Sequence, residues 1–128
     1  MVTVLTPPFL ASDRGDIDVF DDLSQMYAGV EAVDASHMDL FDATGRPLHA
    51  IVDGYTWTVD QHRAEPPDPE RLALILRSYF ARLPKTFSAY SARAATAPSL
   101  DDLVHLRQEL AHEPAPGLWA KLFRRSWG

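Results

Sequence analysis

The stretch that decides the fold spans residues 37–60 and reads HMDLFDATGRPLHAIVDGYTWTVD. Apolar and polar residues alternate in three short runs: 37–40, 48–52 and 55–60. Such alternation is typical of strands with one buried face. Thr44-Gly45 and Asp53-Gly54 separate the runs, and glycine takes the positive φ that tight hairpin turns require. We therefore predict a three-stranded antiparallel meander.

The third run also predicts part of the core. Trp57 alternates with threonines, and a tryptophan side chain brings a large apolar area. We expect Trp57 to pack against Leu76 and Phe80, which lie on the apolar face of a predicted helix.

The segments before the meander predict a strand and a helix. Ile17 and Val19 alternate with aspartates, which indicates a short strand. Asp21 or Asp22 then caps a helix whose apolar residues recur with helical spacing. These residues are Leu23, Met26, Tyr27 and Val30.

The segments after the meander predict further helices. Pro69 suits the first position of a helix that ends at Pro84. Residues 85–98 fit either a helix or a loop, and Ser99 caps another helix. The resulting order is β-α-β-β-β-α followed by one or two C-terminal helices. It predicts an α+β domain with an antiparallel sheet and helices packed on one face.

The length of 128 residues fits one domain, which we place at residues 1–113. Pro114 and Pro116 separate it from a C-terminal amphipathic segment, 114–128, that is either docked on the domain or binds a partner. Tryptophan and arginine dominate interface hot spots. The candidate contact residues of this segment are Trp119, Phe123, Arg124 and Trp127.

The charge of the chain is unevenly distributed. Residues 1–60 carry 11 acidic and 2 basic side chains, within a net charge of −6. An acidic half argues against nucleic acid as a ligand, since phosphates require a basic face. It suits a basic protein partner or self-association, in which complementary charges speed encounter. No apolar stretch is long enough to span a membrane.

Metal and catalytic motifs are not found in the sequence. The absence of cysteine excludes thiolate chemistry. An EF-hand loop beginning at Asp16 would require glycine and glutamate where Asp21 and Tyr27 stand. No HExxH, GxSxG, P-loop or dinucleotide pattern occurs. We therefore expect no metal, no cofactor and no catalytic residue.

Two tracts are familiar, namely VEAVD at residues 30–34 and MDLFDATGRPL at residues 38–48. With the strand and helix before them, they make residues 17–60 resemble small bacterial proteins of unassigned function, some of them similar to immunity proteins that neutralise polymorphic toxins. The resemblance implies an acidic inhibitor that covers a basic toxin site. Asp39, Asp42 and Asp53 would then be surface contacts.

Two functional hypotheses follow. The first is a non-enzymatic binding protein with an acidic face, in the manner of an immunity-type inhibitor. We expect it in the cytoplasm because the N-terminus has neither a basic region nor an apolar run suited to export. The alternative is a small-molecule-binding or enzymatic domain. Its pocket would lie between the strand of Tyr55 and Trp57 and the helix at 70–83.

Overall fold

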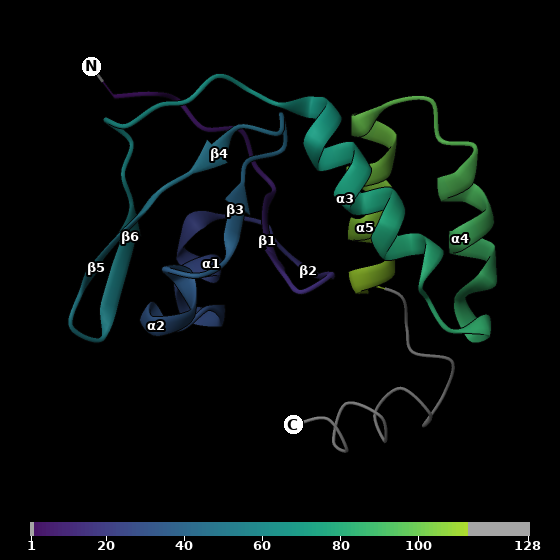
Figure 1. The fold of residues 1–128 in the computed structure, drawn as a ribbon, viewed down its shortest axis with the longest axis horizontal. Coiled ribbons are helices and arrows are strands. Elements are labelled where there is room, and N and C mark those ends of the chain that lie inside the picture. The colour runs from purple at the N-terminus through teal and green to yellow at the C-terminus, as the bar shows by residue number, and fades with distance from the viewer. Residues whose placement is uncertain (1, 113–128) are drawn as a thin grey trace.

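A computed structural model describes residues 2–112 (Figure 1). Its antiparallel main sheet has the strand order β2-β1-β3-β4. The bounds of these strands are β1 Phe9–Asp13, β2 Asp16–Phe20, β3 Asp39–Phe41 and β4 Pro47–Leu48. A separate hairpin pairs β5 (Ala50–Asp53) with β6 (Thr56–Val59). The helices are α1 Leu23–Gly29, α2 Ala32–Ala35, α3 Pro69–Ala81, α4 Ser88–Ala95 and α5 Leu100–His112, with a 3-10 turn η1 at Lys85–Phe87. The α+β class predicted from the sequence is confirmed.

The predicted meander is divided between two sheets. Residues 47–53 form two strands interrupted at His49, so that β4 pairs with β3 while β5 pairs with β6. The hairpin at Asp53-Gly54 is present. Its two central residues are Gly54 and Tyr55, with Gly54 at φ +63. The prediction of one continuous three-stranded sheet was therefore wrong in its strand pairing, because the second run supplies one strand to each sheet.

Strand β1 was missed in the sequence because it lies in the middle of the sheet. Its first four residues are all buried, and they pair with β2 on one side and β3 on the other. A strand buried on both faces has no alternation of apolar and polar residues to reveal it. The turn from β1 to β2 places Arg14 at φ 52 and Gly15 at φ 92, which are the two positive values of a type I′ turn.

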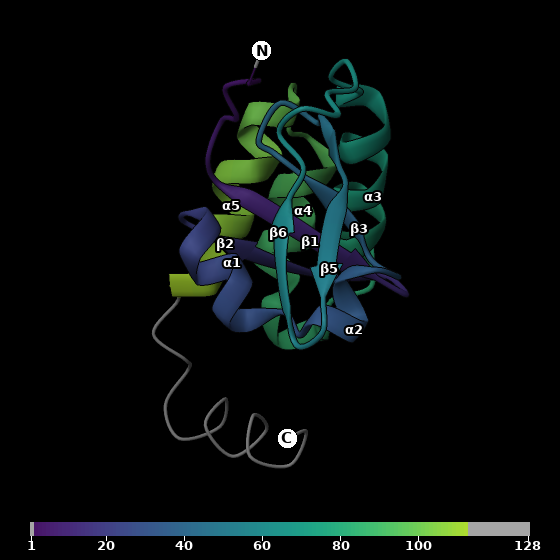
Figure 2. The same ribbon diagram turned by 90° about the vertical axis from the view of Figure 1, so that its left-hand side faces the viewer.

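The sheet separates two apolar cores. Leu10 and Phe41 point into one core with α3, α4 and α5, whereas Ala11 and Leu40 point into the other with α1, α2 and the hairpin. Figure 2 shows the hairpin in front of the sheet and α3, α4 and α5 behind it. Helices α3–α5 therefore lie on one face of the sheet, while α1 and α2 lie on the opposite face. The prediction that the helices pack on one face was wrong, because the sheet has apolar side chains on both faces to be covered.

Trp57 is buried as predicted, but its neighbours differ from those expected. It belongs to the core on the α1 side, whereas Leu76 and Phe80 belong to the core on the α3 side. Its ring meets that of Tyr27 edge to face at 4.9 Å, and its Nε1–H donates to the carbonyl of Val30 at 2.7 Å. The prediction was wrong because it placed α3 on the hairpin rather than on the opposite face of the main sheet.

Arg107 joins α5 to the edge of the main sheet. Its Nε and Nη2 both donate to the carbonyl of Ile17 in the edge strand β2, at 3.0 and 2.6 Å. Its guanidinium lies 5.2 Å from the centre of the Tyr79 ring. The contact satisfies a backbone group on an edge that would otherwise be open to pairing. Within residues 2–112, no helix is both long enough and apolar enough to cross a bilayer.

Candidate binding surfaces

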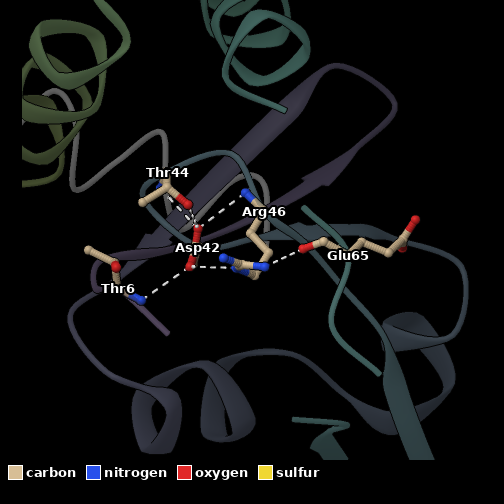
Figure 3. A network of polar contacts seen from close by, with 5 residues as sticks. All are labelled: Thr6, Asp42, Thr44, Arg46 and Glu65. Atoms are coloured by element: carbon tan, nitrogen blue, oxygen red, sulfur yellow. Dashed lines mark hydrogen bonds and ion pairs between the residues drawn. The ribbon is translucent and has the colours of Figure 1, made fainter. Parts of the chain in front are cut away.

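Asp42 is a buried structural residue, so its predicted role as a surface contact is corrected. Only 1% of the residue is exposed. Its carboxylate accepts hydrogen bonds from the amides of Thr6, Thr44 and Arg46 at 2.9–3.2 Å, and from the Thr44 hydroxyl at 2.6 Å (Figure 3). The network fixes the turn at residues 42–46 to the N-terminal arm, and it leaves no carboxylate for a partner protein.

Arg46 extends this network to the connector before α3. Its Nη1 donates to the carbonyl of Glu65, and its Nε lies 3.9 Å from Oδ2 of Asp42 (Figure 3). The buried Nε has no hydrogen-bond acceptor within the described residues. The guanidinium therefore interacts with Asp42 mainly through charge, while its hydrogen bond goes to the connector.

Asp39 is exposed but already has a cationic partner. Its Oδ1 lies 3.2 Å from Nη2 of Arg71, on α3. The same guanidinium lies 5.4 Å from the centre of the Phe41 ring. Asp39 thus links the start of β3 to α3. A partner that used this carboxylate would compete with Arg71.

Asp53 remains the best placed of the three predicted aspartates. It lies at the end of β5 beside the hairpin tip, where Tyr55 is fully exposed. Figures 1 and 2 both place α2 beside this tip. The elements around the tip also expose three aliphatic side chains, Val33, Ile51 and Val52. We call α2 and the β5–β6 hairpin, with these residues, the hairpin face.

The hairpin face carries negative charge that no ion pair among the described residues neutralises. Glu31 is the N-cap of α2, and Asp34 follows Val33 within that helix. Asp53 lies two residues before Tyr55. None of these three acids takes part in an ion pair within residues 2–112. Sequence alone suggested Asp53. Tyr55 was missed because the sequence placed it on the same inward strand face as Trp57. Val33 was missed because no sequence pattern marked it as exposed.

Two surface concavities lie beside the main sheet, not at the hairpin. The larger, of about 660 Å³, is bounded by the β1–β2 turn, the start of β3 and α3. The smaller, of about 190 Å³, lies beside β3 and β4 and includes Arg71 and Glu65. Neither lies between β6 and α3. Because the main sheet separates those two elements, the pocket expected there is not formed.

The perturbed pKa values belong to structural contacts. Burial raises the pKa of the Tyr79 phenol, while nearby Arg107 acts in the opposite direction. A hydrogen bond from Arg93 lowers the pKa of Glu109, and the two side chains meet at 2.8 and 3.1 Å between α4 and α5. Among residues 2–112, no three histidine or acidic side chains gather in a way that could hold a metal ion.

The predicted contact residues of the C-terminal segment lie outside the described part of the chain. They are Trp119, Phe123, Arg124 and Trp127.

Comparisons with known proteins found no match to this chain. No protein-family model matches the chain. Searches of curated proteins and of solved structures also give no match.

Proposed function

We propose that this chain is a non-enzymatic binding protein that takes a basic protein partner on its hairpin face. The single observation that carries this function is the combination at that face. Three acids without a described cation partner, Glu31, Asp34 and Asp53, accompany an exposed tyrosine and aliphatic side chains. Exposed apolar groups with a polar rim are typical of protein interaction sites.

An immunity-type inhibitor is the specific role that fits this chemistry. Such a protein would cover a basic site on a toxin with its acidic face, and it would act in the cytoplasm. The uncompensated carboxylates would speed encounter with a basic surface. Tyr55 would supply the contact area of a hot spot. Nucleic acid is disfavoured as the ligand of this face because both ligand and face are negative.

The test uses the full chain as bait in the native host, with captured proteins identified by mass spectrometry. The informative variant is Asp53→Lys combined with Tyr55→Ala, since both positions are exposed. The control for a similar charge change is Asp101→Lys on α5, which lies on the opposite face of the main sheet.

A supporting result is a basic partner that the wild type and the Asp101→Lys variant retain and the hairpin variant loses. Retention should also fall as salt is raised, because the attraction between exposed charges is screened. Equal capture by all three proteins would contradict the proposal, as would a partner whose binding does not respond to salt.

A further inference from the structure

The larger concavity combines free hydrogen-bond donors from three separate elements. Ser12 of β1 is one of its lining residues. Arg14 and Gly15 come from the β1–β2 turn, and Arg82 comes from the end of α3. His37 lies just before β3 and also borders the space. The volume of about 660 Å³ is in the range of small-molecule sites.

Ser12 is the first sign that this space serves a ligand. It is 9% exposed, and its hydroxyl makes no hydrogen bond within the described residues. Buried polar side chains normally have a partner. The hydroxyl oxygen is not fully enclosed by protein, so it is open to the concavity that Ser12 lines. It is therefore available to a molecule bound there.

Arg14 is the second, independent sign. It has φ 52 at the first central position of a type I′ turn, where asparagine, aspartate or glycine is favoured. A residue with a Cβ in this conformation costs about 1–2 kcal/mol, and such backbone strain clusters at functional sites. The guanidinium of Arg14 has no acceptor within residues 2–112. No hydrogen bond or ion pair of the Arg14 side chain within residues 2–112 therefore offsets the backbone penalty.

Arg82 adds a second guanidinium that the fold itself holds in place. Its Nε donates to the carbonyl of Ser78 at 3.1 Å, and its Nη2 donates to the carbonyl of Gly15 at 3.2 Å. A guanidinium has five N–H donors, so these two bonds leave others for a ligand. A Cβ on Gly15 would lie 2.4 Å from Nη2, so a larger residue there would displace this guanidinium.

The charges around the concavity indicate which ligand fits. Asp39 is engaged by Arg71, which leaves Asp13 as the lining carboxylate that has no ion pair within residues 2–112. Arginine is the side chain best matched to planar oxyanions, through paired N–H bonds. We propose that this concavity binds a small molecule through an oxyanion held by Arg14, Arg82 and Ser12. A singly charged carboxylate fits better than a phosphate dianion, because the carboxylate of Asp13 repels a second negative charge.

The test is an NMR titration of the full chain with acetate, glycine and inorganic phosphate at constant ionic strength. We expect saturable shifts of the Ser12, Arg14 and Gly15 amides, with dissociation constants on the order of 1–10 mM and with acetate and glycine binding more tightly than phosphate. Arg14→Gly removes the guanidinium and relieves the positive φ. The affinity of this variant for acetate and glycine should be at least tenfold lower than that of the wild type. Its melting temperature should stay within about 3 °C of the wild type.

Arg63→Gly, which removes a guanidinium from the exposed connector, is the matched control and should bind as the wild type does. The site is overturned if no probe gives saturable shifts at these amides, or if the Arg14→Gly variant binds as well as the wild type. Tighter binding of phosphate would overturn the assignment of a singly charged carboxylate.

Discussion

At the scale of single residues, burial sets Asp42 apart from the other aspartates of the acidic half. Asp39, Asp42 and Asp53 all stand in polar, turn-rich sequence, and no pattern separates them. The carboxylate of Asp42 is buried because the amide of Thr6, 36 residues earlier in the chain, donates to it. A contact of such long range cannot be predicted from local spacing.

We predict that Asp42→Ala strongly destabilises the protein. The change leaves the amides of Thr6, Thr44 and Arg46 without their acceptor, and it leaves the Arg46 guanidinium without its counter-charge. Losing one member of a buried charged network costs about 3–5 kcal/mol. Urea unfolding would measure this loss. Asp53→Ala is the control and should stay within about 0.5 kcal/mol, because Asp53 is exposed. Equal losses in the two variants would contradict the structural role of Asp42.

Ser12 and Arg14 show the same limit of sequence reasoning at the larger concavity. Neither forms a recognisable motif, and α3, which supplies Arg82, is distant in the chain. Arginine before glycine gives a weaker turn signal than asparagine or aspartate before glycine. The site becomes visible only when the turn, β3 and α3 are placed together.

At the scale of elements, those with a clear period or cap could be predicted. The helix α3 begins at Pro69 as expected, and the Asp68 side chain accepts the amide of Arg71 as an N-cap. The break at His49 could not be predicted, because alternation continues across residues 48–52 while the strand changes its partner. Periodicity gives the face of a strand, but it does not give its neighbours.

Gly45 and Gly54 form a matched pair for a prediction about turns. Both have positive φ, +84 and +63. A Cβ on Gly45 would lie 2.6 Å from the carbonyl oxygen of Asp68, whereas a Cβ on Gly54 would meet nothing within 4 Å. We expect Gly54→Ala to cost about 1–2 kcal/mol from backbone conformation alone. We expect Gly45→Ala to cost about 3 kcal/mol or more, because the start of α3 must move.

Chemical denaturation of the two alanine variants would measure both losses. A smaller loss for Gly45→Ala than for Gly54→Ala would contradict the close packing of the turn at residues 42–46 against α3.

The ion pair between α4 and α5 predicts a dependence on pH. Because the hydrogen bond from Arg93 lowers the pKa of Glu109 in the folded protein, the pair stabilises the fold above the ordinary pKa of the carboxyl group. This stabilisation is lost as the pH falls through the lowered pKa. An NMR titration of the Glu109 carboxyl should give a midpoint that rises in the Arg93→Gln variant. An unchanged midpoint would show that the pair is not formed in solution.

At the scale of the whole molecule, two cores share the strands between them. Consecutive residues of β1 and β3 point to opposite faces, so Leu10 and Phe41 serve one core while Ala11 and Leu40 serve the other. The hairpin face and the larger concavity lie on elements anchored in different cores. Strands β1 and β3 thus connect the two cores that support the two proposed binding surfaces.

This arrangement predicts that the two cores unfold together. Met26 and Leu76 are fully buried, one on each side of the sheet. Replacing either by alanine should cost about 2–5 kcal/mol. Loss of either core exposes the same strands to water, so both variants should unfold in a single transition. The two losses should add to within about 0.5 kcal/mol, because the two residues belong to different cores.

Two probes would follow the two sides separately. Far-UV circular dichroism reports mainly on the long helices α3 and α5, and fluorescence reports on Trp57 once Trp119 and Trp127 are replaced by phenylalanine. Coincident curves from both probes are the mark of two-state unfolding. If Met26→Ala shifted the fluorescence transition alone, the hairpin side would be an independent unit. The sheet would then couple neither the cores nor the two binding surfaces that they carry.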